Sequence, residues 1–209
     1  MKVVALAALA LAGSAALDLR TVILPPNQVG QGYQLIARND GFGVKSAPTL
    51  DLCGRDGYPS EKLRVDRLQV NYLKQRTPLG LSNEVVRYKT GGAKQALREV
   101  GLHAMSCPRA PISTGDTQVP KARFTITRIH DAKLLKGYVA VKVRTVATVK
   151  GKRYDQVSYA VYQQLGDVLS GVYSFGPNTP AQLKFALHAA EQSAQLLRKA
   201  AKPPKGPPA

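Results

Sequence analysis

Tryptophan is absent from this 209-residue chain, and phenylalanine occurs only four times. The core must therefore be built from Val, Leu, Ala and the nine Tyr, a mixture that is typical of sheet faces. Acidic residues are also scarce, because 13 Asp and Glu accompany 30 Lys and Arg and leave a formal charge of +17. A field of that sign attracts polyanions such as nucleic acid, lipid headgroups or acidic wall polymers.

The chain contains no catalytic or cofactor motif. His103, His130 and His188 are not spaced as zinc ligands, and no serine lies in a Gly-x-Ser-x-Gly nucleophile motif. Gly91-Gly92 can form an anion-binding nest, although a plain turn explains the pair as well. We therefore predict a non-enzymatic protein with no cofactor and no metal. A secreted hydrolase with a dispersed site, using His103 or His130 with Asp131, is the alternative.

Long hydrophobic runs are missing as well. The apolar stretch Val3–Ala12 is shorter than the roughly 20 residues that a spanning helix needs. Lys2 before it and the small residues Ser14-Ala15-Ala16 after it are typical of an export signal, which we place at residues 1–16. A buried N-terminal helix or an uncleaved anchor is the alternative. We expect a secreted or cell-envelope protein with no transmembrane span in the mature chain, and export argues against nucleic acid as its partner.

The chain has only two cysteines, Cys53 and Cys107. A zinc site needs a second pair of ligands, and none is spaced for it. In an exported protein the default for such a pair is a disulfide, with free thiols as the alternative. We predict a Cys53–Cys107 disulfide that staples the first half of the chain.

Residues 17–52 are interrupted by many Pro, Gly and Asn residues, which argues against long regular elements. We predict a short strand at Arg20–Leu24, one helical turn and then a loop. Leu35 and Ile36 are expected to enter the core from this loop, with Tyr33 beside them.

Beyond Cys53 the hydrophobic periodicity alternates between strands and two helices. Alternating apolar residues predict strands around residues 67–74, 85–89, 123–127, 139–146, 157–162 and 169–175. A 3.6-residue period predicts helices at Gly92–His103 and from Pro180 to about Ala201, the second capped by Thr179. The fold class is therefore α+β, with a mainly antiparallel sheet of about six strands and two principal helices covering one face. We assign residues 17–201 to a single domain and residues 202–209 to a disordered, basic, Pro-rich tail.

The positive charge is concentrated in the second half, where residues 121–209 hold 15 Lys or Arg against four Asp or Glu. Several basic residues fall at polar-face or turn positions of the later strands, and Tyr162 is expected nearby. The predicted polyanion or ligand surface consists of Arg123, Arg128, Lys142, Arg144, Lys152, Arg153 and Tyr162. A solvated basic face with no specific ligand is the alternative reading of these residues.

The order of elements resembles a known family. An export signal is followed by a lead with Leu24-Pro25, then Cys53, two strands, an Ala-rich helix ending near Cys107, further strands and a final Ala-rich helix. This order is similar to that of the PknH-like extracellular sensor domains of actinobacterial secreted proteins, lipoproteins and receptor kinases.

The resemblance implies an antiparallel sheet with flanking helices, a cleft for an unidentified ligand and no enzymatic activity. This chain departs from the family pattern in having one disulfide instead of two and Ser14 in place of a lipidated cysteine. No ligand residues can be carried over from the resemblance. We therefore predict a sensor-like domain that recognises an unknown ligand, such as an anionic wall polymer or a lipid headgroup.

Overall fold

The computed structural model describes residues 17–40, 47–54, 57–77, 79–108, 110–114 and 119–201. The predicted export signal at residues 1–16 and the predicted tail at residues 202–209 lie outside these ranges. Within the described ranges, no helix is long and apolar enough to cross a membrane.

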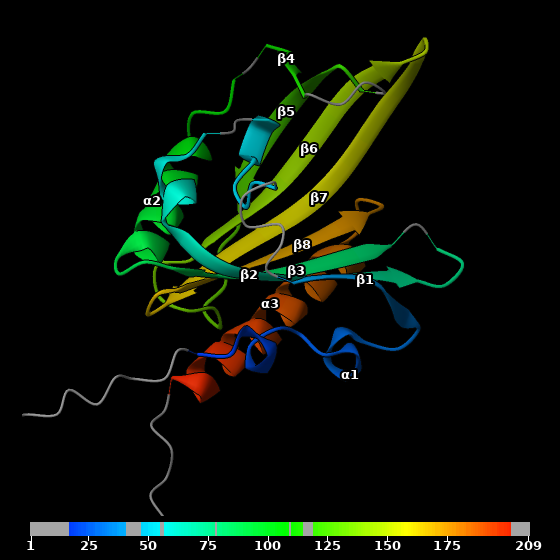
Figure 1. Cartoon of the computed structure of the whole chain (residues 1–209). Helices are drawn as coiled ribbons and strands as arrows, with labels where there is room; N and C mark the ends of the chain where they lie inside the picture. Colours follow the sequence, from blue (N-terminus) through cyan, green and yellow to red (C-terminus); the bar gives the residue numbers. More distant parts are fainter. Residues whose placement is uncertain are drawn as a thin grey trace, which may run out of the picture.

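The described strands form one antiparallel sheet in the order β1-β2-β3-β8-β7-β6-β5-β4 (Figure 1). Their bounds are β1 Tyr33–Asp40, β2 Arg64–Lys74, β3 Gly80–Tyr88, β4 Ile112–Ser113, β5 Lys121–Arg128, β6 Val139–Val149, β7 Lys152–Leu165 and β8 Val168–Gly176. The predicted α+β class and antiparallel sheet are confirmed. The predicted strand number was wrong, because the sheet has eight strands instead of about six and β1 and β4 were missed.

Both principal helices form where the periodicity predicts them. Helix α2 spans Gly92–His103 and α3 spans Pro180–Ala200. The Thr179 hydroxyl caps α3 by accepting a hydrogen bond of 3.2 Å from the Gln182 amide, which satisfies one N–H group of the first turn. A third, four-residue helix, α1, spans Pro26–Val29.

The sheet is covered on both faces, so the prediction of one covered face was wrong. Helix α2 packs on one face and α3 on the other (Figure 1). Val86 of β3 belongs to the hydrophobic cluster under α2, whereas the adjacent Val85 belongs to the cluster under α3. Both valines are fully buried, because β3 is a central strand between the two helices. We refer to the two faces as the α2 face and the α3 face.

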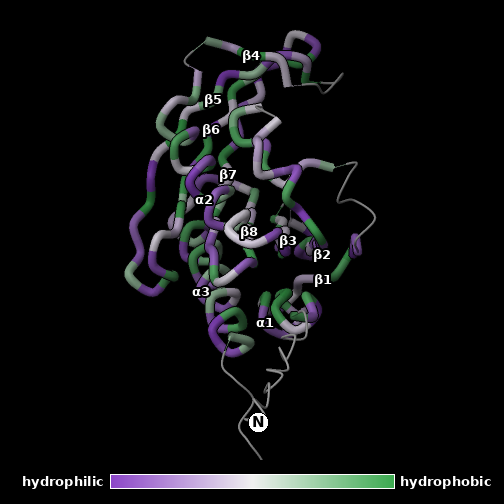
Figure 2. Tube along the Cα trace, turned by 60° about the vertical axis from the view of Figure 1, so that its left-hand side comes forward, coloured by the Kyte–Doolittle hydropathy of each residue, from purple (hydrophilic) through white to green (hydrophobic). Residues whose placement is uncertain are grey.

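The lead-in segment differs from its prediction at Arg20–Leu24. A short 3₁₀ helix forms at Leu19–Thr21 instead of a strand, because the Asp18 side chain accepts a hydrogen bond from the Arg20 amide. The Leu24 amide then donates to Oδ1 of Asn83, and the Tyr72 hydroxyl donates to the Leu24 carbonyl. The segment is therefore fastened to the α3 face, and α1 lies beside α3 (Figure 2).

Strand β1 is an edge of the sheet that the sequence did not predict. Its Leu35 and Ile36 side chains are 46% and 58% exposed, so the expectation that they enter the core was wrong. The pairing with β2 shifts register between Leu35 and Ala37, as in a β-bulge. A bulge interrupts the alternation of buried and exposed side chains, and an edge strand has a neighbour on one side only.

Candidate ligand-binding cavity

The segment 47–54, which we call the strap, is fastened across the α2 face by two carboxylates. The amides of Thr49 and Leu50 donate to the two carboxylate oxygens of Glu61, at 3.0 and 3.2 Å. The Thr49 hydroxyl donates to Oε1 of Glu84 at 2.9 Å. Since Glu84 lies in the central strand β3, these bonds hold the first half of the strap against the middle of the sheet.

Two arginines complete this buried network. Arg67 forms an ion pair with Glu84, in which both side chains are almost fully buried. Arg64 forms an ion pair of 3.0 Å with Glu61 and donates to the Ala47 carbonyl of the strap. Burial raises the pKa of Glu84 and of Glu61, and the neighbouring Arg67 and Arg64 oppose the shift.

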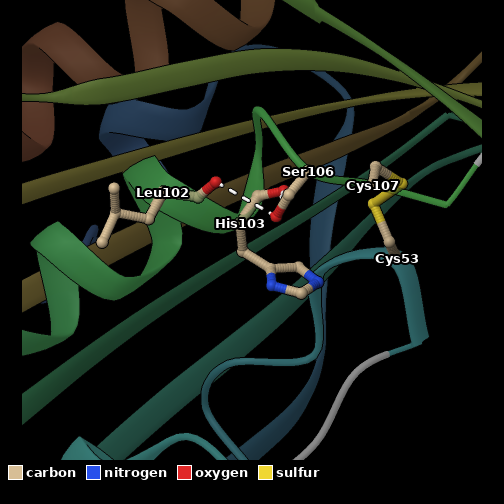
Figure 3. The surroundings of a disulfide bond; sticks show 5 residues. All are labelled: Cys53, Leu102, His103, Ser106 and Cys107. Atoms are coloured by element: carbon tan, nitrogen blue, oxygen red, sulfur yellow. Dashed lines mark hydrogen bonds between the residues drawn. A yellow bond between two sulfur atoms is a disulfide. The ribbon is translucent and has the colours of Figure 1, made fainter.

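The second half of the strap is anchored covalently. Cys53 and Cys107 form the predicted disulfide, with their Cα atoms 6.0 Å apart. Figure 3 shows how Cys107, just beyond the end of α2, reaches the strap. In the turn between the end of α2 and Cys107, the Ser106 hydroxyl donates a hydrogen bond to the Leu102 carbonyl at 3.3 Å (Figure 3). The strap is thus tied at one end to the sheet and at the other to the end of α2.

A cavity of about 460 Å³ lies between the strap and strands β5 to β8 on the α2 face. Cys53 and Leu52 form part of its strap wall, and Phe124, Val143 and Ala160 contribute apolar surface from the sheet. Its polar groups are the carboxyl of Asp51 and the hydroxyls of Thr114, Thr145, Ser158, Tyr162 and Tyr173.

The two tyrosines pack edge to face, with ring centroids 5.6 Å apart. Burial raises the pKa of both phenols well above the usual value, so each stays a neutral hydroxyl near neutral pH. The surrounding protein also raises the pKa of the Asp51 carboxyl through desolvation. The Tyr173 hydroxyl donates a hydrogen bond to the Thr49 carbonyl at 3.5 Å and is also hydrogen-bonded with Tyr162. The cavity therefore places hydroxyl groups, of which these two already have protein partners, and one carboxyl next to an apolar wall.

The strand pairing divides the predicted basic surface between the two faces. Side chains of directly paired residues share a face, and those of successive residues alternate. The α3 face of these strands carries four of the predicted residues, Arg123, Lys142, Arg144 and Arg153. The α2 face carries Arg128 and Tyr162. Lys152 lies at the start of β7, beside the β6–β7 turn. Tyr162 is 1% exposed and lines the cavity. Arg128 donates to the Gly101 carbonyl of α2 at 3.0 Å.

Three of the predicted cations meet in a second hollow of about 620 Å³, which we call the basic groove. Arg123, Arg144 and Arg153 line it, together with Lys121. Arg144 makes two hydrogen bonds to the Asp155 carboxylate, at 2.8 and 2.6 Å, and Arg153 makes a third at 3.1 Å.

These bonds hold the pKa of Asp155 well below its usual range and raise that of Arg144. In the part of the chain that the structure describes, no carboxylate pairs with Lys121 or Arg123. Among the residues that the structure describes, the groove thus has one neutralising carboxylate for four cations.

The residues of the alternative hydrolase reading lie in different places. His103 is buried at the end of α2, with its ring edge-on to Tyr58 at 5.6 Å. His130 is exposed in the loop after β5, and the Asp131 carboxylate accepts a hydrogen bond from the Lys133 amide in the same loop. Over the described ranges, no group of three or more His, Cys, Asp or Glu side chains could hold a metal ion.

The sequence did not predict the network under the strap. Arg67 alternates with the apolar residues of β2, a position that meets solvent in a half-buried strand, yet it is 5% exposed. Asp51, Glu61 and Glu84 were not singled out. A charged residue at a polar position of a strand gives the same alternating pattern whether that face of the sheet meets solvent or is covered by another segment of the chain.

The geometry defines an α+β domain with helices on both faces of an antiparallel sheet and a strapped cavity on one of them. No family model matches the sequence, and no curated protein matches it. The fold resembles that of the extracellular domain of PknH from Mycobacterium tuberculosis, with a TM-score of 0.55 and 11% sequence identity. The match covers 84% of this chain and 94% of that domain. The structural resemblance inferred from the sequence is therefore confirmed at the level of the fold.

Proposed function

We propose that this protein is an extracytoplasmic, non-enzymatic, sensor-like domain that binds a component of the cell envelope in the strap cavity. The cavity itself carries this proposal, because its wall is a segment held by buried carboxylates at one end and by a disulfide at the other. A wall anchored at both ends gives a pre-formed pocket, and pre-formed pockets with an apolar surface and a few polar groups are typical ligand sites. The disulfide supports an oxidising, extracytoplasmic location.

The chemistry of the lining favours a ligand rich in hydroxyl groups. Neutral phenols such as those of Tyr162 and Tyr173 both donate and accept hydrogen bonds, and so do the hydroxyls of Thr145 and Ser158. We propose an acidic wall polysaccharide as the ligand class. Its sugar hydroxyls would bind in the cavity. The unpaired cations Lys121 and Arg123, which lie on the other face of β5, would attract negative charges farther along the polymer and accelerate binding.

The proposal is tested by binding of the full chain to purified acidic wall polysaccharide. We expect affinity to fall as the salt concentration rises from about 50 to about 500 mM, since screening weakens the attraction. Tyr162→Phe should lower affinity about fivefold through the loss of one hydrogen bond. The double variant Lys121→Gln/Arg123→Gln should slow association. The exposed pair Lys184→Gln/Lys199→Gln on α3 removes the same charge and should leave association nearly unchanged.

A mass-spectrometric search for a ligand that co-purifies with the protein provides an independent test. An oligosaccharide lost from the Tyr162→Phe variant would support the proposal. Polysaccharide binding that is insensitive both to salt and to Tyr162→Phe would contradict it.

A further inference from the structure

A third hollow, separate from the strap cavity and the basic groove, runs between helix α2 and the segment that leads into β6. Its volume is about 740 Å³, and none of its lining residues lines the strap cavity. Leu97 of α2 and Val139 at the start of β6 provide apolar surface. Leu102 and Met105, in and just after the last turn of α2, are 57% and 65% exposed and add further apolar area at that end of the helix. We call this hollow the α2 groove.

Three glycines keep the groove open. A Cβ atom at Gly101 would lie 3.3 Å from Cγ2 of Val139, so a side chain there would press against the apolar wall. Gly91 and Gly137 have positive φ angles of 80° and 79°, which other residues rarely adopt, and the space where their side chains would stand is empty. These three lining residues therefore contribute no side chains that would fill the hollow.

The rim of the groove is positively charged. Lys94 and Arg98 lie one turn apart on α2, and Lys136 comes from the loop before β6. All three are exposed, and none pairs with a carboxylate of the described ranges. Like charges four residues apart destabilise a helix, so the Lys94–Arg98 pair has a cost that nothing within α2 compensates.

The one acidic residue of α2 is already engaged elsewhere. Glu99 accepts hydrogen bonds from the Ser60 hydroxyl at 2.6 Å and from the Gln95 side chain at 2.7 Å. At the far end, the Asp167 carboxylate accepts a hydrogen bond from the Gly91 amide. Neither carboxylate is among the lining residues of the groove, and Asp167 touches the groove only through the Gly91 amide at its end.

An apolar trough with three cations on its rim is complementary to one kind of molecule. We propose that the α2 groove binds a single-chain anionic amphiphile, with its hydrocarbon chain against Leu97 and Val139 and its carboxylate or phosphate headgroup among Lys94, Arg98 and Lys136. The apolar contact supplies binding free energy in proportion to the buried area, and the cations select the anionic headgroup. The site is separate from the strap cavity and does not depend on its ligand.

The test titrates the full chain with decanoate, with 1-decanol as the uncharged analogue of equal chain length, and follows the amide resonances by NMR. We expect decanoate to shift the signals of Gly91, Gly101 and Gly137 and to leave that of Gly54 in the strap unchanged. Lys94→Gln/Arg98→Gln should weaken decanoate binding about tenfold and bring it close to that of decanol. Lys121→Gln/Arg123→Gln removes equal charge from the other face and should change affinity by less than about twofold.

Vesicles of phosphatidylglycerol show whether the amphiphile is free or part of a bilayer. Vesicle binding that is lost in Lys94→Gln/Arg98→Gln and kept in Lys121→Gln/Arg123→Gln supports the proposal with a membrane source. Equal weakening in both double variants, equal affinity for decanoate and decanol, or no shift at the three glycines overturns it. None of these outcomes bears on wall polysaccharide, so failure here is distinguishable from failure of the proposed function.

Discussion

The hydroxyl of Thr49 donates a 2.9 Å hydrogen bond to Glu84, and this bond joins the strap to the central strand of the sheet. The same hydroxyl accepts a hydrogen bond from Arg64 at 3.0 Å. Thr49 is 4% exposed, so water cannot replace either partner without opening the strap. One buried side chain therefore makes two of the hydrogen bonds that hold the wall of the candidate cavity.

Replacing Thr49 by Val keeps the shape of the side chain and removes both hydrogen bonds. We expect a loss of about 2 kcal/mol in the free energy of unfolding, because the polar atoms of Glu84 and Arg64 stay buried without this partner. Urea denaturation measures the change. Thr127→Val, at an exposed position of β5, is the matched control and should change stability by less than about 0.5 kcal/mol. Equal effects of the two substitutions would contradict the role of the strap contact.

Removing one partner of the Arg67–Glu84 pair should be costly. In Arg67→Gln the carboxylate of Glu84 stays buried without its counter-charge, and such losses are about 3 kcal/mol near neutral pH. The contact between Arg87 and Asp66, at 3.5 Å and partly exposed, provides the comparison. Asp66→Asn should cost less than about 1 kcal/mol. A similar small cost for Arg67→Gln would show that water reaches the pair.

The raised pKa values of Glu61 and Glu84 predict a specific dependence of stability on pH. Between the usual carboxyl pKa of about 4.3 and the raised value, the folded state binds more protons than the unfolded state. The free energy of unfolding should therefore increase as the pH is lowered through that window. Asp155 acts in the opposite direction, since its lowered pKa makes stability fall below about pH 4.

Urea denaturation at a series of pH values tests this prediction. Glu84→Gln should flatten the gain in stability on acidification, whereas Asp155→Asn should leave that gain intact. A wild-type protein whose stability only falls as the pH is lowered below neutral would refute the predicted sign.

The disulfide links residues 54 positions apart. In the chain-entropy model a loop of this length contributes about 4 kcal/mol, so Cys53→Ser/Cys107→Ser should lose roughly that amount. The same loss should appear when the wild-type protein is reduced, and reduction should not affect the double variant further. Ser106→Ala, beside Cys107, removes only local hydrogen bonds and serves as the control.

Asn83 joins the lead-in segment to the sheet, so shortening its side chain should destabilise the fold. Its side chain accepts from the Leu24 amide and donates to Ser170 and to the Gly171 carbonyl, all in the fully buried interior. Asn83→Ala should cost about 3 kcal/mol, because several polar groups lose their partner. Asn71→Ala, on the neighbouring strand and partly exposed, should cost much less. Thermal unfolding of both variants measures the difference, and equal costs would contradict the role of Asn83 in joining the two segments.

Much of the secondary structure could be predicted because its periodicity is local. Helix α2 occupies the predicted residues, and α3 begins at the predicted proline. The turn at Lys150-Gly151 joins β6 and β7, with positive φ angles of 48° and 77°. Strand β1 was missed because its pairing with β2, and not its own pattern, makes it a strand.

The candidate cavity could not be predicted from the same signals. Its wall is an irregular segment, and its anchors Glu61 and Glu84 are separated from it by 11 to 35 residues. Tyr162 was expected beside the basic residues because they share neighbouring strands. The register of β6 with β7 places it on the opposite face from Arg144.

The sequence by itself determined the α+β class, the positions of the two principal helices, the pairing of the only two cysteines and the excess of positive charge. These follow from periodicity, capping residues and composition, which act over a few residues or over the whole chain. Only the tertiary structure decided that both faces of the sheet are covered, that Arg67 and Glu84 are buried together, and that the strap forms one wall of a cavity. Those features depend on contacts between distant segments, and a polar position in a strand does not reveal in advance what will cover it.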